Sequence, residues 1–334
     1  MNIYVTCILY SIYLLDGICK RTKLLLNQSV NRNHADALLL SGGLDSSILA
    51  SILNPKCSLT VSLGNNTPDL EFAKSVAARY SEKHIEIILT DEKLLEIIEQ
   101  VIRILKTFDP MEIRNSSVVF VGMKVAQENG YANVMTGDGG DELFAGYNYL
   151  RRYFSNTANL DAELRRLWDK MHFSSLQIAK TNGIEVKTPF LDEKFSAYAK
   201  SIDVSEKIGK YGGYQWGKFI LRKCFELELG KEIVWRQKFA QEQGAGTVKI
   251  KNYFLNNFDE DYQIGTKQAL SAGVKIRDKE HLYYYKLFRK YFSSPKDEEC
   301  SYLRCPECNG CFNSIGKFCR ICGAFPVIPV LKKW

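Results

Sequence analysis

The spacing of apolar residues along 36–136 alternates between two patterns. Four short apolar runs predict buried strands, and two of them are rich in branched residues. The runs are 37–40, 57–63, 84–89 and 132–136. The first and the last are each followed by a loop with several glycines, so these two strand ends stand out along the chain.

The segments between these runs have the spacing and the terminal residues of helices. The predicted helices are 48–53, 67–81, 90–105 and 116–129. The third begins at Thr90 and has an apolar face made of Leu94, Leu95, Ile97, Ile98, Val101, Ile102 and Leu105. Strands that alternate with helices predict a doubly wound parallel α/β sheet, in which ligands bind at the carboxyl ends of the strands.

The beginning of the chain is apolar from 3 to 15, but this run is too short to span a bilayer and stops at Asp16. No basic residue precedes it and no small-residue cleavage site follows it, which disfavours a targeting segment. We therefore expect residues 1–35 to form a helical lead-in with 3–15 buried. We also expect the protein to be cytoplasmic, without a membrane partner.

Composition limits what can surround these elements. The chain has 334 residues, 46% of them hydrophobic, so it can bury a sizeable core, and its length suggests two domains. Its formal net charge of +7 comes from mixed acidic and basic residues, which predicts a solvated surface and gives weak support for an RNA or DNA partner. Five of the ten cysteines lie between 305 and 322, and we expect the others to be single reduced thiols.

The loop 40–47, LSGGLDSS, lies between the first strand and a helix. Glycines let the backbone approach a ligand closely, and helix amides with serine hydroxyls favour an anion such as phosphate. Asp45 would repel phosphates unless a hard cation such as Mg²⁺ lies between them, so the loop predicts a nucleotide and magnesium site. The alternative is a Gly-Gly turn with an Asp-Ser helix cap. No Gly-Lys-Ser/Thr follows, so this is not the usual P-loop.

The loop 136–147, TGDGGDELFAGY, repeats this pattern at the end of the last strand. It places Asp138, Asp141 and Glu142 among glycines. Because ligands of such sheets bind at one edge, we expect both loops to face one crevice. A calcium loop is the main competitor, but an EF-hand needs a longer run of ligands that ends in a bidentate Glu.

The tail carries two C-x-x-C knuckles, Cys305 with Cys308 and Cys319 with Cys322, which predict a small zinc ribbon over 300–334. Too few apolar residues surround them to fold alone, so we expect a structural Zn²⁺ to supply folding energy. Cys311 forms a further C-x-x-C with Cys308, which leaves open another ligand set or an iron–sulfur cluster.

Together, LSGGLDSS and TGDGGDELFAGY resemble the synthetase domain of glutamine-hydrolysing asparagine synthetases, in the ATP-pyrophosphatase (PP-loop) superfamily. Further blocks stand in the order of that family: 67–70 with His84, 113–117, 185–192, 235–238 before 244–246, and 279–285. The resemblance implies a PP-loop, HUP-like fold over 36–295 with a helical C-terminal part, followed by the ribbon.

The resemblance also implies a reaction. A carboxylate, with aspartate as the expected substrate, attacks the α-phosphorus of ATP to give an acyl-adenylate and pyrophosphate, and ammonia then displaces AMP. The resemblance implies that pyrophosphate is bound by Ser41, Gly42, Gly43 and Ser46, and adenosine by Leu40, Leu63 and Gly137. It implies that Mg²⁺ is bound by Asp45 and Asp141. Lys238 and Arg114 would contact the phosphates, and Asp138 would accept a proton.

Three features depart from this family. Its glutaminase nucleophile is the cysteine at the mature N-terminus, whereas this chain begins Met1-Asn2-Ile3, so we expect ammonia from solvent or from a separate glutaminase subunit. Lys187 stands where the family commonly has arginine, and 168–182 does not clearly keep the substrate-side pattern, so aspartate rests on the resemblance alone. The ribbon is the third departure.

The ribbon supports a rival hypothesis, a PP-loop enzyme that adenylates a tRNA base for thiolation or amidation and binds RNA through its zinc module. Such enzymes do not share the GDGGDELFAGY and WRQK blocks. A non-catalytic nucleotide-binding scaffold is disfavoured, because the phosphate loop, both acids and the loop lysine are all present. We therefore predict an ATP-dependent amide-forming ligase that uses ATP and Mg²⁺.

Overall fold

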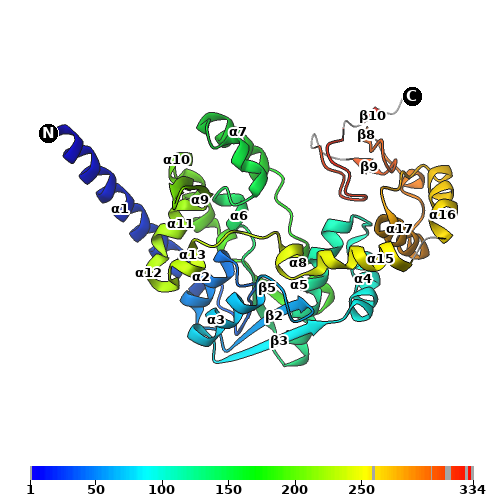
Figure 1. Ribbon diagram of the computed structural model, residues 1–334, viewed down its shortest axis with the longest axis horizontal. Coiled ribbons are helices and arrows are strands. Elements are labelled where there is room, and N and C mark those ends of the chain that lie inside the picture. The colour runs from blue at the N-terminus through cyan, green and yellow to red at the C-terminus, as the bar shows by residue number, and fades with distance from the viewer. Residues whose placement is uncertain (1, 258–259, 302, 313–316, 328–329, 332–334) are drawn as a thin grey trace.

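A five-stranded parallel sheet lies at the centre of this computed structural model, which describes residues 2–257, 260–301, 303–312, 317–327 and 330–331 (Figure 1). Its strands are β1 (Ala37–Leu39), β2 (Cys57–Leu63), β3 (Lys83–Leu89), β4 (Asn133–Met135) and β5 (Glu185–Lys187). Their order is β3-β2-β1-β4-β5, so the winding reverses between β1 and β4. The loops after these two strands open at the same edge, at the topological switch point. The predicted fold class is confirmed.

The central strands β1, β2 and β4 are buried between their neighbours in the sheet. Ala37 pairs with Cys57 on one side and with Val134 on the other, and all three are fully buried. β2 and β3 pair over the whole length of β2, every residue of which is buried. In β2 the buried polar residues Ser58, Thr60 and Ser62 alternate with apolar ones, so this strand is covered on both faces although only one face is fully apolar.

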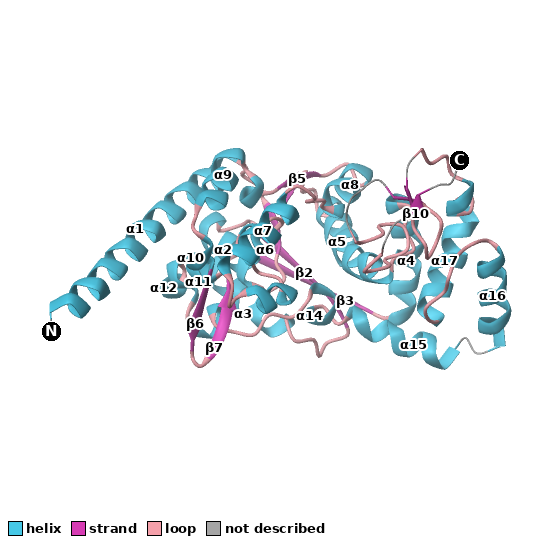
Figure 2. Cartoon of the chain, turned by 90° about the horizontal axis from the view of Figure 1, so that it is seen from above, coloured by secondary structure: helices cyan, strands magenta, loops and turns pink. Residues whose placement is uncertain are grey.

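Helices cover both faces of the sheet (Figures 1 and 2). One apolar core joins Leu38 and Leu40 to α1 (Asn2–Arg32), α2 (Leu44–Leu53), α3 (Leu70–Tyr80), α6 (Gly140–Leu143), α9 (Glu193–Ser201), α11 (Phe219–Cys224), α12 (Glu226–Leu229) and α13 (Lys231–Val234). The core on the other face joins β2 to α4 (Asp91–Leu105), α5 (Pro110–Glu128), α8 (Ser174–Thr181), α15 (Ile250–Asn257), α16 (Glu260–Ser271) and α17 (Lys279–Tyr291).

Smaller elements complete the chain. The remaining helices are α7 (Thr157–Trp168), α10 (Val204–Lys207), α14 (Gln241–Gly244) and the 3₁₀ helices η1 (Asn148–Tyr153), η2 (Pro189–Leu191), η3 (Thr247–Lys249) and η4 (Pro295–Asp297). A hairpin is formed by β6 (Ile208–Tyr211) and β7 (Tyr214–Gly217). The tail forms a three-stranded sheet in the order β10-β8-β9, from β8 (Leu303–Arg304), β9 (Cys311–Phe312) and β10 (Val330–Leu331).

The starts of α4 and α5 show how local sequence fixes a helix. Thr90 caps α4 as predicted, because its hydroxyl accepts a hydrogen bond from Lys93 N at 3.3 Å. The start predicted for α5, near residue 116, is wrong. Asp109 accepts a hydrogen bond from Met111 N at 3.1 Å, and Pro110 occupies the first helical position, where its missing N–H costs nothing.

The predicted lead-in is the long helix α1, whose first turns extend away from the sheet (Figure 1). Its later side chains pack into the core, where Leu26 and Val30 are buried. The burial expected for residues 3–14 lies outside the side chains that the structure describes. Among the described residues, none of the helices is both long and apolar enough to cross a bilayer.

Two disulfides correct the expectation that cysteines outside the 305–322 cluster are single reduced thiols. Cys19 of α1 is bonded to Cys224 of α11, and Cys300 is bonded to Cys311. The first pair is separated by 205 residues and meets only because α1 packs against α11. Sequence spacing cannot reveal such a pair, because long-range packing creates it.

The tail shares its apolar core with α4, α5 and α17, since its four knuckle cysteines are buried in the same cluster as those helices. Phe108 N, just before α5, donates a hydrogen bond to Ile321 O at 2.8 Å. The division into 36–295 and 300–334 stays a prediction, and the ribbon is in contact with the body on which it lies.

Lys207 is a buried lysine that should destabilise the fold. Its side chain is fully buried, and its Nζ lies 4.8 Å from the Trp168 ring centroid without a hydrogen-bond partner among the described residues. Burial lowers its pKa from 10.5 to about 8. Between these two pH values the unfolded state binds more protons, so wild-type stability should rise with pH across that window.

We expect Lys207→Met to remove this slope and to raise the free energy of unfolding at pH 7 by up to about 3 kcal/mol. Urea unfolding between pH 7 and 10 measures both effects. Lys200→Met is the matched control, because Lys200 also lies over Trp168 but is exposed. Equal behaviour of the two variants would show that burial of Lys207 carries no penalty.

Candidate active site

The loop after β1 is held in shape by its own hydroxyl groups. Ser46 Oγ accepts a hydrogen bond from Ser41 N at 3.2 Å and lies 3.0 Å from Ser41 Oγ. Gly42 has a φ of +71°, and a Cβ there would lie 2.6 Å from Ala73 N, so the position favours glycine. The loop enters α2 through Gly43. It thus has the form expected of a phosphate loop, and pyrophosphate binding by these residues stays a prediction.

The loop after β4 packs directly on the first loop. A Cβ at Gly137 would lie 3.1 Å from Asp45 Cβ, and one at Gly140 would lie 2.5 Å from Asp45 Oδ1. Glycine at these two positions therefore permits the two loops to touch. The contact brings Asp45 and Asp141 into one cluster, at the switch point between β1 and β4.

One buried lysine joins the two acids. Lys218 Nζ contacts Asp45 Oδ2 and lies 2.7 Å from Asp141 Oδ1, and its side chain is only 3% exposed. Lys218 stands at the N-cap of α11 with a φ of +55°. Its backbone N–H donates a hydrogen bond to Phe144 O at 2.7 Å, which fixes α11 against the second loop.

The charged groups in this cluster shift one another's pKa values. Burial raises the pKa of Asp45 above its usual value, against the attraction of Lys218. Burial also acts to raise the pKa of Asp141, but Lys218 and Lys238 outweigh it and hold that pKa below its usual value. Burial opposes the charge of Lys218, yet the two carboxylates prevail and raise its pKa. Asp141 and Lys218 are therefore charged at neutral pH.

Lys238 reaches the cluster from the segment between α13 and α14. Its Nζ contacts Asp141 Oδ1, lies 3.5 Å from Gly146 O and is 5.0 Å from the Tyr147 ring centroid. Its side chain is 26% exposed, so this lysine borders solvent, in contrast to Lys218. This position fits a cation that can contact a ligand at the mouth of the site.

Arg236 ties the same segment to the first loop. Its Nη1 donates a hydrogen bond to Gly42 O at 2.8 Å, its Nη2 contacts the carboxylate of Asp69, and its guanidinium lies 4.1 Å from the Phe72 ring centroid. The sequence motifs include Arg236 and Asp69 without indicating what they do. In the structure they join the loop after β1 to the start of α3.

Asp138 is held by two hydroxyl groups. Thr136 Oγ1 donates to Asp138 Oδ2 at 2.9 Å, and Ser175 Oγ donates to the same oxygen at 2.5 Å. Burial raises the pKa of Asp138, while these two hydrogen bonds act to lower it and the Asp45 carboxylate acts to raise it. A carboxylate with a raised pKa beside the acidic pair is suited to accept a proton.

The three residues predicted to contact adenosine lie at the ends of three neighbouring strands. Leu40 follows β1, Leu63 ends β2 and Gly137 follows β4. Both leucines are buried, and Leu63 N donates a hydrogen bond to Ala245 O at 2.8 Å. The segment around Ala245 thus covers the end of β2, next to the phosphate loop.

Arg114 is engaged elsewhere in a buried ion-pair network. Its Nη1 lies 2.6 Å from Glu280 Oε1 and its Nη2 lies 2.6 Å from Glu242 Oε2. Its side chain is 4% exposed. These contacts give Arg114 a structural role that joins α5, α14 and α17, and its contact with phosphates stays a prediction.

Lys218 is the site residue that sequence reasoning missed. It follows the β6–β7 hairpin in a stretch with no recognisable site motif. Only the fold places it between two acids that are far away in the sequence. A lysine at a helix start after a tryptophan and a glycine carries no local signal, because burial of its charge depends entirely on those distant partners.

Mg²⁺ fits the acidic pair. Asp45 Oδ1 is buried and has no hydrogen-bond partner in the described part of the chain. A carboxylate oxygen left in this state is an oxygen ligand of the kind that Mg²⁺ prefers. We therefore name Asp45 and Asp141 as the residues that would hold the ion.

The four knuckle cysteines form one buried cluster, as predicted. All four sulfurs lie within 4.8 Å of one another, with Cys305 and Cys322 Sγ atoms 3.9 Å apart and Cys308 and Cys319 Sγ atoms 3.8 Å apart. A tetrahedral Zn²⁺ with Zn–S bonds of about 2.3 Å has sulfurs about 3.8 Å apart, so the cluster fits this ion. Cys311 is in a disulfide, which disfavours the alternative ligand set that included it.

We expect the freshly purified protein to contain one tightly bound Zn²⁺ per chain. Cys319→Ser should lose the metal, because three thiolates bind it more weakly. Cys311→Ser is the matched control and should keep it, since this sulfur is outside the cluster. Inductively coupled plasma mass spectrometry measures the content, and iron or an apo protein would contradict the zinc assignment.

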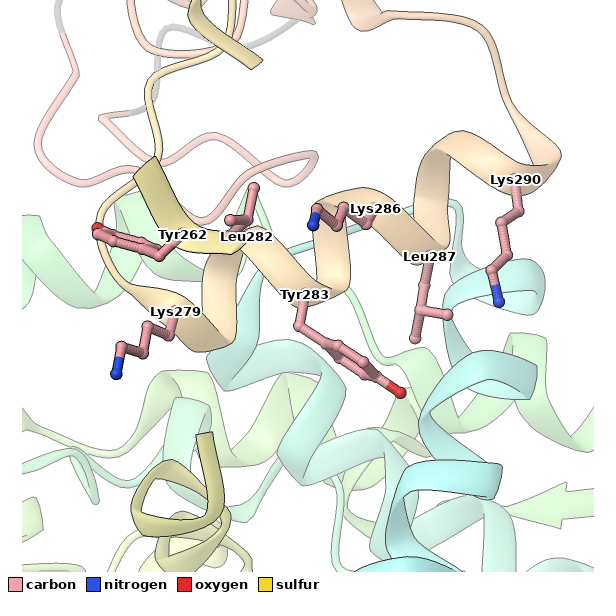
Figure 3. Close-up of a pocket in the computed structure, with 7 residues that line it drawn as sticks. All are labelled: Tyr262, Lys279, Leu282, Tyr283, Lys286, Leu287 and Lys290. Atoms are coloured by element: carbon pink, nitrogen blue, oxygen red, sulfur yellow. The ribbon is translucent and has the colours of Figure 1, made fainter. Parts of the chain in front are cut away.

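A pocket of about 250 Å³ is formed by α16 and α17 (Figure 3). It is lined by Tyr262 of α16 and by Lys279, Leu282, Tyr283, Lys286, Leu287 and Lys290 of α17. The predicted site residues do not line it. We therefore place the candidate active site at the two loops and not in this pocket.

The fold and the paired loops define a doubly wound α/β protein with its polar site at the topological switch point. The sequence matches the asparagine synthase family over 22–180 and 164–303. The chain therefore belongs to the asparagine synthase family, and the resemblance seen in its motifs is confirmed.

Three curated relatives show how far the match extends. The chain is 33% identical to the glutamine-hydrolysing asparagine synthetase of Gallus gallus, over 76% of this chain and 48% of the relative. Identity to the Homo sapiens enzyme of the same name is 28%, over 85% of this chain and 54% of the relative. Identity to asparagine synthetase B of Escherichia coli is 30%, over 79% and 51%. The chain thus spans about half the length of these relatives.

Proposed function

We propose that this chain is an ATP-dependent ligase that adenylates a carboxylate, releases pyrophosphate and forms an amide with ammonia. The observation that carries the proposal is the contact of Lys218 with Asp45 and Asp141 across the two strand-end loops, in a chain of this family. Aspartate is the proposed substrate and asparagine the product, because the relatives are named asparagine synthetases.

In the first step, an oxygen of the substrate carboxylate attacks the α-phosphorus of ATP, and pyrophosphate leaves with the electron pair of the broken bond. The amides and hydroxyls of the loop after β1 bind the leaving group, and Lys238 offsets its growing charge. Mg²⁺ held by Asp45 and Asp141 would neutralise further charge on the phosphates. Lys218 keeps the two carboxylates together, and Arg236 keeps the loop in place.

In the second step, the nitrogen of ammonia attacks the acyl carbon, and AMP leaves with the electron pair of the acyl–phosphate bond. The attacking nitrogen becomes positive and must lose a proton, for which Asp138 is the proposed acceptor. Thr136 and Ser175 both donate to Asp138 Oδ2, so the proton goes to Oδ1. These hydroxyls hold the carboxylate in one orientation.

The nitrogen that reaches this site is ammonia, taken from solution or delivered by a glutaminase partner. The relatives are named as glutamine-hydrolysing, and this chain matches about half of each. The test therefore supplies ammonium, which does not require a glutaminase partner.

The test is incubation of the purified chain with ATP, Mg²⁺, ammonium and a panel of carboxylates. Chromatography separates AMP from ADP, and mass spectrometry identifies the amide. We expect AMP and pyrophosphate with aspartate, and asparagine in equal amount. ADP with phosphate, or turnover that depends on tRNA and yields no amide, would contradict the proposal.

A further inference from the structure

The segment 169–173 links α7 to α8, and one hydrogen bond joins it to the knuckle of the zinc ribbon. We propose that the knuckle between Cys319 and Cys322 holds this segment through Arg320, and so positions the Ser175 hydroxyl on Asp138. Arg320 is then a positioning residue for the amide-forming step. The inference rests on the proposed function, because it assigns Asp138 to that step.

The proposed link from the knuckle to the active site ends in a short hydrogen bond. Ser175 is buried, and its Oγ donates to Asp138 Oδ2 at 2.5 Å. Ser175 lies in the first turn of α8, directly after the linking segment. Its place therefore depends on where that segment brings the chain into α8.

The link begins at the knuckle between Cys319 and Cys322. Arg320 Nη2 donates a hydrogen bond to Lys170 O at 3.0 Å, which pins the linking segment from the ribbon side. Arg320 stands between two residues of the metal cluster, and Gly323 N donates to Cys319 O at 2.8 Å to close the turn. A metal bound by the four thiolates would fix the backbone from which Arg320 extends.

The knuckle is itself seated on the body of the protein. Thr107 Oγ1 donates to Arg320 O at 2.7 Å, and Phe108 N donates to Ile321 O at 2.8 Å. Arg277 Nη2 donates to Cys322 O at 2.6 Å. The knuckle is thus anchored to the segments before α5 and α17, so it can hold 169–173 relative to the sheet.

A second contact supports the same placement. Ser116 Oγ of α5 lies within hydrogen-bond distance of Ser174 Oγ at 2.9 Å and of Glu112 Oε1 at 3.1 Å, and the Ser174 hydroxyl can donate to Ser116 while Ser116 donates to Glu112. α5 begins at the segment on which the knuckle rests. The start of α8 is therefore held on one side by α5 and on the other by the ribbon.

The two half-reactions depend on different parts of the site. Adenylation depends on the loop after β1 and on Asp141 and Lys238, and the ribbon contacts none of these through any described hydrogen bond. Amide formation depends on the orientation of Asp138, which Ser175 fixes. Loss of the Arg320 contact should therefore let AMP form while less of the acyl-adenylate becomes amide.

The experiment compares Arg320→Ala with Lys317→Ala, a matched control that removes another exposed cation of the ribbon. Hydrogen exchange with mass spectrometry should show about tenfold faster exchange in 169–177 for Arg320→Ala, with zinc content unchanged. The ratio of amide formed to AMP formed should fall to the ratio measured for Ser175→Ala. Arg320→Lys, which keeps a donor, should restore both values in part.

Two outcomes would overturn the inference: exchange in 169–177 equal to that of Lys317→Ala, or an unchanged ratio of amide to AMP. Failure of the proposed function looks different, because the wild-type chain would then form no amide from any carboxylate. In that event the exchange measurement still decides whether Arg320 holds the segment.

Discussion

Asp141→Asn should lower the rate of pyrophosphate formation by about a thousandfold and leave the fold intact. Asparagine keeps the shape of the side chain but removes the charge that pairs with Lys218 and Lys238. Loss of several kcal/mol of transition-state stabilisation gives this factor, since about 1.4 kcal/mol corresponds to tenfold. Asp45→Asn should have an effect of the same order, because both carboxylates would hold the proposed Mg²⁺ ion.

Pyrophosphate release at saturating ATP measures this effect, with circular dichroism to check the fold. Asp36→Asn is the matched control, because Asp36 precedes β1 at the opposite edge of the sheet and pairs with Lys56 at 3.0 Å. Its rate should stay within about twofold of wild type. Wild-type turnover in either loop variant would reject a shared magnesium site.

Lys218→Met should lower the free energy of unfolding by about 3 kcal/mol, because it removes the buried common partner of two half-buried carboxylates. The loss should shrink as pH falls from 7 towards 5. Burial raises the pKa of Asp45 even in the wild type, and without Lys218 that pKa rises further. A carboxyl whose pKa is raised on folding destabilises at high pH and is relieved once it is protonated.

Urea unfolding in the absence of Mg²⁺ measures this stability. Lys238→Met provides the comparison, because Lys238 contacts the same Asp141 from a partly exposed position. Its loss should be at most about 1 kcal/mol. Equal stability of the wild type and Lys218→Met would show that the buried lysine does not hold the loops together.

The parallel sheet and both site loops were predictable because their signals are local. Asp45 and Asp141 each stand in a glycine-rich loop between an apolar strand and a helix, and parallel strands bring such loops to one edge. The knuckle cysteines are predictable for the same reason, since their spacing is that of a metal site.

The contacts between distant segments could not be predicted from the sequence. Lys218 and Ser175 reach the acidic loops from α11 and α8, and Cys19 meets Cys224 across 205 residues. The start of α5 is different, because Asp109 and Pro110 are a local signal for a helix start that the spacing of apolar residues does not reveal. The ion pairs of Arg114 with Glu242 and Glu280 are a further example of contacts between distant segments, since these three residues lie far apart in the sequence.

The most direct measurement follows one oxygen atom from the substrate. The wild-type chain is given ATP, Mg²⁺, ammonium and aspartate labelled with ¹⁸O in its side-chain carboxylate, and the products are analysed by mass spectrometry. If the carboxylate attacks the α-phosphorus, one labelled oxygen appears in AMP, pyrophosphate carries no label, and asparagine is formed. Unlabelled AMP, or label in phosphate together with ADP, would contradict adenylation of the carboxylate.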